Sequence, residues 1–481
     1  MEAKFRSLSN DVALVFDLDG TLIHSDTLAE NFVEALFTSP AQLLRSAPKM
    51  MGGKAAIKET VASIVALDPA FLLYREEIVE LARSAKEEGR NVYLVTAAHQ
   101  SIADAISEHL GVFDGAKGSD GRLNLKGINK LAWLKESFPG GFIYAGDSAA
   151  DVKIWQEAEA AILVGRGVKF ASRLKSGSIV DTLAPHQSQF IKDWASELRL
   201  HQWSKNLLLF IPLLLGHLAT DLGAIGTTVA AFLVLSLIAS GTYIVNDLAD
   251  LKADRAHPTK KNRAIASGRI GVMTGLAVSL GLIGLGLISA ILIGRGFAIL
   301  VSVYLCLTLL YSFRLKRLPF LDVSIIGTLF TIRVLMGTAI HPELDYSPWL
   351  TSFSMCFFFS LAMAKRHVEV MRANAFGSSK ISGRGYSAND WPLTLAYGVA
   401  TAMASIVIML LFVALDVGSA DTYSNPVWLY LAPAAMFLWT QRIWLLSHRT
   451  ELNDDPIIFA IKDRASYVIG LVIFAGFALA V

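Results

Sequence analysis

Apolar residues follow two different patterns along the chain, and the pattern changes near residue 200. Before that point, short runs rich in β-branched residues alternate with amphipathic helical stretches; the runs lie at 11–20, 91–100, 141–148 and 160–165. This alternation predicts a parallel sheet wrapped by helices, which is the α/β class. The stretch 24–85 lacks strand-like runs, so we expect a helical insertion there within a domain of residues 1–170. Residues 171–200 are polar and partly amphipathic, and we expect them to form a connector.

After residue 200 the chain is dominated by apolar segments close to bilayer-spanning length. We place nine of them, at 206–220, 226–245, 272–293, 296–313, 319–340, 348–365, 392–415, 426–446 and 466–481. This pattern predicts an all-α, multi-pass membrane domain of nine helices over residues 201–481. The fold class is therefore multi-domain, an α/β domain followed by a polytopic helical domain.

Composition agrees with this division. The 481 residues are 53% hydrophobic and 17% charged, whereas ordinary soluble domains carry about 25% charged residues. Residues 1–200 have a net charge of −4 and residues 201–481 a net charge of +6. The high hydrophobic fraction and low charge exclude a single soluble globule and a disordered chain. A disulfide scaffold is also excluded, because the chain has only two cysteines, Cys306 and Cys356, and both lie in apolar runs. The overall net charge of +2 gives no reason to expect nucleic acid as a partner.

The polar loops between the apolar segments differ strongly in charge. With a cytoplasmic amino terminus, the inner loops collect most basic residues, six of them in 252–269 and five in 365–384, and the outer loops carry Arg295 alone. The positive-inside rule then predicts that the α/β domain and the candidate sites are cytosolic and that the carboxyl terminus lies outside. We expect the membrane to be a bacterial inner membrane.

The end of the first strand carries two carboxylates. Asp17 and Asp19 are two residues apart, so strand periodicity places them on one side, at the edge where α/β sheets bind ligands. A nucleophile and an acid/base group at this spacing, followed by Gly20, suit phosphoryl transfer to an aspartate. An Asp-Gly turn after a strand is the simpler alternative for this motif.

The whole set of motifs resembles the haloacid dehalogenase (HAD) superfamily of phosphatases over residues 11–168. The resemblance implies that Asp17 is the nucleophile, that Asp19 is the general acid/base and that 24–85 is a cap. It further implies phosphoryl-oxygen contacts from Thr96 and Lys126, with Lys130 as the rival lysine, and one Mg²⁺ held by Asp17, Asp19, Asp147 and Asp151. Hard oxygen ligands are those that Mg²⁺ prefers.

A second acidic motif follows the second apolar segment. Asn246 and Asp247 are followed by Asp250 and Asp254, and helical spacing puts the three aspartates on one face. Carboxylates that share a face repel one another unless a cation lies between them. We therefore expect a Mg²⁺ site for a pyrophosphate, and a solvated juxtamembrane helix is the alternative.

This NDxxDxxxD pattern resembles the UbiA superfamily of intramembrane prenyltransferases, which have nine helices. Most members carry a second motif, DxxxD, but here Asp322 is followed four positions on by Ile326. The segments 199–206, 250–263, 308–317 and 364–369 instead resemble one branch, decaprenyl-phosphate 5-phosphoribosyltransferase and its relatives. The branch implies phosphoribosyl pyrophosphate (PRPP) as the donor and a polyprenyl phosphate as the acceptor.

PRPP carries a 5-phosphate besides its pyrophosphate, so it needs cationic contacts beyond a metal ion. Arg333 is the most informative candidate, because a charge within an apolar span is costly unless it faces a cavity or a partner. A structural pair with a buried carboxylate is its alternative role. The candidate substrate-binding set is Lys205, Asn246, Lys261, Arg263, Tyr311, Lys316, Asp322, Arg333, Lys365, Arg366 and Lys462.

Three hypotheses follow. The first is a bifunctional enzyme that transfers 5-phosphoribose to a polyprenyl phosphate and then removes the 5-phosphate with its HAD domain. The second is prenyl transfer from a polyprenyl diphosphate to an aromatic or glycerol acceptor, and Ile326 counts against it. The third makes the HAD half a non-catalytic regulatory or assembly module. The resemblance leaves the oligomeric state open, and a homo-oligomer is one of the states compatible with it.

Overall fold

The computed structural model describes residues 9–120, 124–175, 178–183, 189–375, 377, 381, 384–416, 423–452, 459 and 463–480. The chain divides into two compact units. The first comprises residues 1–198 together with 243–279, and the second comprises 199–242 together with 280–481. The long helix α10 (Leu222–Ala249) belongs to both, because the division falls within it.

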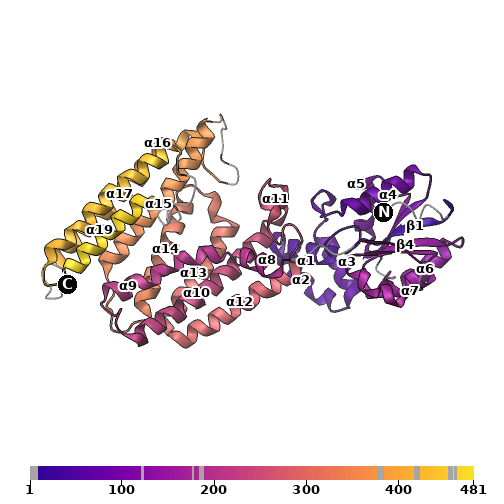
Figure 1. The fold of residues 1–481 in the computed structure, drawn as a ribbon, viewed down its shortest axis with the longest axis horizontal. Helices are drawn as coiled ribbons and strands as arrows, with labels where there is room; N and C mark the ends of the chain where they lie inside the picture. Colours follow the sequence, from indigo (N-terminus) through magenta and orange to yellow (C-terminus); the bar gives the residue numbers. More distant parts are fainter. Residues whose placement is uncertain are drawn as a thin grey trace. The chain divides into compact units, whose positions relative to one another are not determined.

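The first unit contains a six-stranded parallel sheet of order β3-β2-β1-β4-β5-β6, drawn in Figure 1. The strands are β1 (Ala13–Phe16), β2 (Val92–His99), β3 (Gly115–Ser119), β4 (Phe142–Gly146), β5 (Ala160–Val164) and β6 (Ile179–Leu183). The α/β class predicted from the alternating pattern is thus confirmed, and β6 is an additional strand inside the predicted connector. The central strand β1 pairs with both β2 and β4, so the carboxyl ends of these three strands meet at one edge.

Residues alternate between the two faces of the sheet. Leu14 and Phe16 pack in one core with residues of α4 (Glu76–Glu87) and α5 (Gln100–Leu110). Val15 faces the other core, with residues of α6 (Ile128–Ser137) and α7 (Val152–Glu157). Figure 1 shows α4 and α5 on one side of the sheet and α6 and α7 on the other. Burial on both faces explains why the strands are apolar runs without polar alternation.

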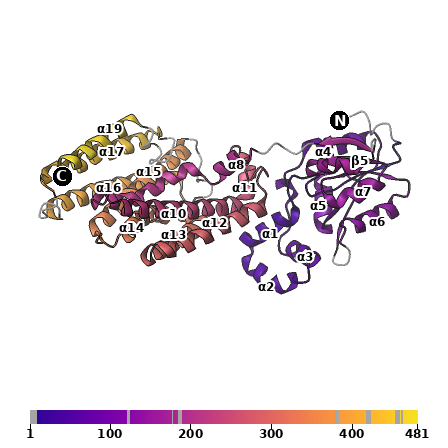
Figure 2. The same ribbon diagram turned by 60° about the horizontal axis from the view of Figure 1, so that its bottom comes forward.

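Three helices follow the first strand, as the pattern predicts. They are α1 (Thr27–Thr38), α2 (Pro40–Met50) and α3 (Lys54–Ile64), which share a small apolar core around Ala35, Leu43 and Val61. Figure 2 shows the three helices grouped together. The predicted cap of 24–85 also includes most of α4, which packs into the sheet core instead.

The first unit also contains α8 (Phe190–Glu197), the end of α10, the short helix α11 (Leu251–Ala256) and the first turns of α12 (Val272–Ile293). The segment that carries the second acidic motif therefore lies in the same compact unit as the parallel sheet.

Helices joined by short loops make up most of the described residues of the second unit. A 3₁₀ segment (Leu200–Leu209) leads into α9 (Phe210–Leu215) and then α10. The remaining helices are α12, α13 (Arg295–Phe313), α14 (Leu321–Ala339), α15 (Pro348–Ala375), α16 (Trp391–Leu411), α17 (Leu431–His448) and α19 (Arg464–Ala480). In the described parts of the chain, five helices are long and apolar enough to cross a membrane. The helical membrane domain is confirmed, and the count of nine spans remains a prediction.

Close helix contacts hold the second unit together. α14 packs with α15, α16 and α17 in one apolar core, around residues such as Val334, Phe358 and Trp444. At Gly398 of α16, an added Cβ would lie 2.0 Å from the Trp444 ring of α17. Small residues at such crossings let membrane helices approach closely, so α16 and α17 depend on this glycine.

Candidate active sites

The first candidate site lies at the carboxyl end of β1. The backbone N–H of Asp17 donates to Ala145 O at the end of β4, over 2.9 Å, which brings the two strand ends together. Gly20 has a φ of +74°, and a Cβ there would lie 2.3 Å from Asp147 Oδ2. The turn after β1 therefore requires glycine both for its left-handed backbone and for the approach of Asp147.

Lys130 is the lysine that pairs with the proposed nucleophile. Its Nζ lies 2.9 Å from Asp17 Oδ1 and donates to Tyr144 Oη over 2.8 Å. The side chain is 2% exposed, so its charge is held in a desolvated position where it acts strongly on a bound anion. The backbone N–H of Leu18 also donates to Asp17 Oδ1, over 2.8 Å.

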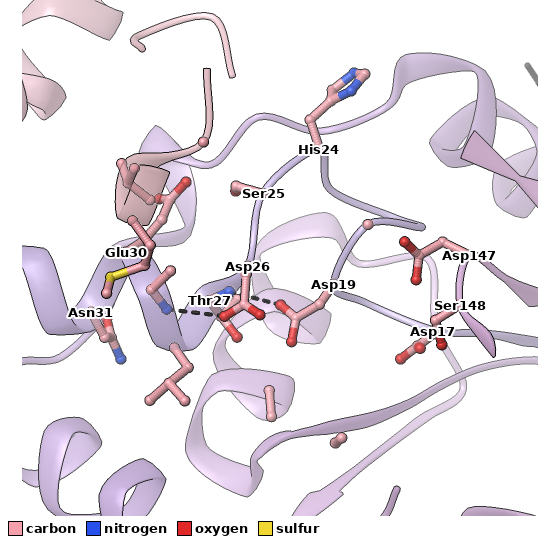
Figure 3. Close-up of a pocket in the computed structure, with 18 of the residues that line it drawn as sticks. Asp17, Asp19, His24, Ser25, Asp26, Thr27, Glu30, Asn31, Asp147 and Ser148 are labelled. Atoms are coloured by element: carbon pink, nitrogen blue, oxygen red, sulfur yellow. Dashed lines mark hydrogen bonds between the residues drawn. The ribbon is translucent and has the colours of Figure 1, made fainter. Parts of the chain in front are cut away.

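Three carboxylates gather beside this pair. Oxygen atoms of Asp17, Asp147 and Asp151 lie within 4.8 Å of one another, and Figure 3 shows Asp17 and Asp147 close together beside Ser148. Asp151 is oriented by Ser148, whose backbone N–H and Oγ donate to Oδ2 over 3.0 and 2.7 Å, and by Tyr144 Oη at 3.1 Å. Hard carboxylate oxygens at this separation fit a Mg²⁺ ion.

Burial changes the acidity of this site. Desolvation, followed by the charge of Asp26, raises the pKa of Asp19 to about 7. Desolvation and the neighbouring Asp17 raise the pKa of Asp147 to about 6. Asp19 accepts a hydrogen bond from the Thr27 N–H at 2.8 Å, which fixes its side chain beside the cap (Figure 3). A carboxyl group with this pKa can both donate and accept a proton near neutral pH.

The two predicted phosphate contacts, Thr96 and Lys126, differ in their burial. Thr96 is fully buried within β2, which continues three residues further to His99, and its Oγ1 accepts the N–H of Ala98 at 3.0 Å. The pocket around the aspartates is lined there by Ala97 and Ala98. Lys126 lines the same pocket and is exposed, whereas the ion pair with Asp17 is made by Lys130.

The second candidate site lies at the junction of α10 and α11. Arg263 Nη1 lies 2.9 Å from Asp247 Oδ1 and 2.5 Å from Asp254 Oδ2. Asn246 Nδ2 donates to Asp250 Oδ2 over 3.2 Å. Desolvation raises the pKa of Asp254, with Arg263 opposing the shift. A guanidinium of the same segment therefore lies between two of these carboxylates, Asp247 and Asp254.

A buried network surrounds Asp322 at the start of α14. Asp322 is 0% exposed, and its Oδ2 lies 2.9 Å from Arg366 Nη2. Tyr386 Oη donates to Asp322 Oδ1 over 2.8 Å and accepts the Phe320 N–H at 2.7 Å. Arg384 Nη1 lies 3.8 Å from the same carboxylate. The contacts of Asp322 are therefore internal, and they hold α14 to α15 and to the segment before α16.

Arg333 lies within the apolar part of α14. Its Nε donates to Asn206 Oδ1 over 3.0 Å, its Nη2 to Tyr304 Oη over 2.9 Å, and its Nη1 to Leu329 O over 2.6 Å. Its guanidinium also lies 5.2 Å from the centre of the Phe330 ring. These partners are all neutral, so the positive charge is hydrogen-bonded but not balanced by a carboxylate among the described residues.

An apolar cavity of about 750 Å³ lies in the second unit. Aromatic and aliphatic side chains of α15, α17 and α19 line it, together with Ser204 and Lys205 of the 3₁₀ segment. Lys205 Nζ lies 5.8 Å from the centre of the Phe330 ring, the ring that Arg333 also contacts. The cavity thus joins an apolar interior to a cationic group.

The sequence model of the UbiA prenyltransferase family matches residues 209–460, more than half of the chain. The chain belongs to the UbiA prenyltransferase family. The model of haloacid dehalogenase-like hydrolases matches residues 14–156. The protein is therefore a HAD-like domain fused to a UbiA membrane domain, as the two sets of motifs predict, and proteins of both families are generally Mg²⁺-dependent.

Three relatives of this UbiA protein differ in the part of the chain that they match. The protein y4nM of Sinorhizobium fredii is 57% identical over 97% of this chain and 90% of its own length. Nodulation protein NoeC of Azorhizobium caulinodans is 31% identical over 58% of this chain and 92% of NoeC. The decaprenyl-phosphate phosphoribosyltransferase of Corynebacterium glutamicum is 34% identical over 36% of this chain and 53% of that enzyme. The fused arrangement is thus matched along nearly its whole length by y4nM.

The remaining predicted residues of the UbiA domain have less distinctive surroundings. Lys261 and Lys365 are exposed and Lys316 is half-buried. Tyr311 Oη accepts a hydrogen bond from Arg384 at 2.8 Å. Lys462 lies outside the described residues. Their substrate contacts remain predictions.

Sequence reasoning did not single out Tyr144 or Tyr304 as site residues. Tyr144 holds Lys130 and Asp151, and Tyr304 holds Arg333. The available signal was the same in both cases: each is a tyrosine in an otherwise apolar strand or span, and a buried hydroxyl needs a hydrogen-bond partner. The sequence pattern alone does not say which partner that is.

Proposed function

We propose that this protein is a bifunctional membrane enzyme. Its UbiA domain transfers 5-phosphoribose from PRPP to a polyprenyl phosphate, and its HAD domain removes the 5-phosphate to leave polyprenyl-phosphoryl ribose. The observation that carries the proposal is the assembled centre of Asp17, Lys130, Asp147 and Asp151 in the same chain as a UbiA domain. A regulatory module that does not turn over substrate has no need for such a centre.

Features of the UbiA domain support phosphoribose over prenyl transfer. Ile326 replaces the second carboxylate of the DxxxD motif, and relatives that match part of this domain are named decaprenyl-phosphate phosphoribosyltransferases. Arg333, with neutral partners, supplies a desolvated positive charge suited to a substrate phosphate. The apolar cavity of about 750 Å³ suits a polyprenyl chain.

The transfer step exchanges one bond to the ribose for another. An oxygen of the polyprenyl phosphate forms a bond to C1 of the ribose, and the bond from C1 to the pyrophosphate breaks, so pyrophosphate leaves. Asp247, Asp250 and Asp254 would hold Mg²⁺, which would offset the negative charge of the pyrophosphate. Arg263, already placed between two of these carboxylates, would contact a phosphate when the metal is bound.

The hydrolytic step uses the geometry around Asp17. Lys130 and the Leu18 N–H both engage Oδ1, so Oδ2 is the oxygen that attacks the phosphorus of the 5-phosphate. Asp19 gives a proton to the departing 5-hydroxyl oxygen and then takes one from the water that hydrolyses the aspartyl phosphate. Mg²⁺ held by Asp17, Asp147 and Asp151 would offset the charge of the phosphoryl group.

The test of the transfer step is incubation of the full-length protein with labelled PRPP, Mg²⁺ and a polyprenyl phosphate, followed by lipid analysis. We expect label in the lipid fraction with the wild type and a loss of about 10²-fold or more with Asp250→Asn. Label transfer from a polyprenyl diphosphate to an aromatic or glycerol acceptor, with none from PRPP, would contradict the proposal.

A further inference from the structure

The pocket of the HAD domain is not lined by that domain alone. It has a volume of about 710 Å³ around the aspartate centre. Besides the strand ends and the cap helices α1 and α3, its lining includes Arg255, Ile265, Ile270, Val272 and Met273. These residues belong to the segment 255–274, which follows the second acidic motif and lies in the same compact unit as the sheet. We name this segment the pocket wall.

Ion pairs join the cap helix α1 to the helix that begins the pocket wall. Arg255 Nη2 lies 2.8 Å from Glu30 Oε1, and Arg255 Nη1 lies 2.9 Å from Glu30 Oε2. Both side chains are less than 10% exposed, and Arg255 Nη1 also donates to Phe71 O over 2.9 Å. A bidentate, desolvated pair fixes geometry more strongly than a surface contact.

The same two helices are joined a second time. Lys252 pairs with Glu34. Glu30 and Glu34 are one turn apart on α1, and Lys252 and Arg255 are one turn apart on α11, so two acidic residues on one helix face meet two basic residues on another. The matching charges make α11 a specific partner of the cap helix.

The far end of the pocket wall is the start of a candidate membrane span. Val272 is the first residue of α12 (Val272–Ile293), one of the helices long and apolar enough to cross a membrane. Ile265, Ile270 and Val272 form the apolar side of the pocket. The cavity that contains the aspartate centre is therefore also lined by the first turn of a candidate membrane helix.

Two further cations face this cavity. Lys54 and Lys58 lie one turn apart on α3 and line the pocket, and Lys58 Nζ donates to Ala97 O over 2.6 Å. They are separate from Lys130, which pairs with Asp17. The pocket thus offers positive charge for a second anionic group besides the phosphate that reacts at Asp17.

We propose that this pocket selects a membrane lipid that carries two phosphate groups, one of them the phosphate monoester that reacts at Asp17. The pocket wall, held in place by Arg255, determines this specificity. The inference rests on the proposed hydrolytic function of the HAD domain. A soluble sugar phosphate has no lipid part to contact Ile270 and Met273, which line the pocket.

The test compares two substrates of the full-length protein in phosphatidylcholine vesicles. One is synthetic polyprenyl-phosphoryl 5-phosphoribose, which needs no prior transfer step, and the other is ribose 5-phosphate. We expect the wild type to favour the lipid in kcat/KM by about tenfold or more. Arg255→Ala and Met273→Ser should reduce that preference, taken as the ratio of the two kcat/KM values, by a similar factor.

Arg269→Ala is the matched control. Arg269 lies in the same segment, is absent from the pocket lining and pairs with Asp193 at 2.8 Å, so its removal should leave the preference intact. The inference would be overturned if Arg255→Ala lowered kcat/KM equally for both substrates. It would also be overturned if the wild type preferred ribose 5-phosphate. Failure of the wild type to hydrolyse either substrate would instead overturn the proposed hydrolytic function, and the inference with it.

A second measurement does not depend on activity. A carbodiimide joins a lysine amine to a carboxylate in direct contact, so the Lys252–Glu34 pair should give a cross-linked peptide in the wild-type protein. Lys252→Arg keeps the charge and removes the reactive amine, and it should abolish that peptide. Absence of the Glu34–Lys252 peptide from the wild type would contradict the placement of the pocket wall against the cap.

Discussion

At the scale of single residues, the HAD centre depends on which lysine reaches Asp17. Lys126 and Lys130 are four positions apart, and both side chains are compatible with the motif. Only the start of α6 (Ile128–Ser137) decides between them, because it turns Lys130 into the core toward Asp17 and Tyr144. Lys126 precedes the helix and is exposed.

This difference gives a direct prediction. Lys130→Met should lower phosphatase kcat by about 10²–10³-fold, since it removes a desolvated cation from a reacting anion. Lys126→Met, the matched variant, should lower it by only a few-fold. The two kcat values are measured with the full-length variants and synthetic polyprenyl-phosphoryl 5-phosphoribose as the substrate. The opposite ranking would assign the role to Lys126.

Asp322 gives a second prediction at this scale. Its carboxylate is fully buried and pairs with Arg366, so Asp322→Asn removes the buried partner of this guanidinium and leaves, among the described residues, only its pair with the half-buried Glu369. Loss of one partner of such a pair costs about 3–5 kcal/mol, and we expect a clearly lower Tm for the purified protein in detergent. Glu451→Gln, which changes an exposed acid, should leave Tm unchanged. An unaltered Tm in Asp322→Asn would show that the network does not stabilise the fold.

At the scale of elements, local patterns predicted more of the HAD-like domain than of the membrane domain. Strand-end motifs such as Asp17 and Asp147 are short and contiguous, and parallel pairing brings them together without further information. The role of α4 was not predictable in this way, because an amphipathic helix looks the same in a cap and against a sheet. The partner of Asp247 and Asp254 was also missed, since nothing local distinguishes Arg263 from the other basic residues of its loop.

Within the membrane domain, α14 sets Asp322 and Arg333 on one helix, about 16 Å apart at 1.5 Å per residue. Sequence reasoning named both residues but gave them similar roles. The structure separates them: Asp322 is balanced by Arg366, and Arg333 is held by neutral groups. The distinction arises from α13, α15 and the 3₁₀ segment, which are far apart in the sequence.

The unbalanced charge of Arg333 leads to a prediction for this helix. Arg333→Ala should lower phosphoribosyl transfer by about 10²-fold, because a desolvated charge–phosphate contact is lost, and should leave hydrolysis of synthetic polyprenyl-phosphoryl 5-phosphoribose unchanged. Arg442→Ala, which breaks the Arg442–Asp463 pair, is the control for losing an arginine from the same domain. Unchanged transfer kinetics in Arg333→Ala would contradict a role in phosphate binding.

At the scale of the whole molecule, one chain carries an acidic HAD-like domain and a basic membrane domain. The acidic domain contains the carboxylates of the proposed phosphatase centre, and the basic residues of the membrane domain include those that we propose bind PRPP. Covalent linkage raises the local concentration of one domain's product for the other. Removal of the 5-phosphate then draws a reversible transfer toward product.

The most direct test of this coupling uses PRPP labelled with carbon-14 in the ribose and phosphorus-32 in the 5-phosphate. Full-length protein, Mg²⁺ and a polyprenyl phosphate are added, and the two labels are counted in the lipid fraction. The account predicts carbon-14 without phosphorus-32 for the wild type, and equal amounts of both for Asp17→Asn. Equal amounts of both labels in the lipid made by the wild type would contradict the account. Lipid from Asp17→Asn that has still lost phosphorus-32 would contradict it as well.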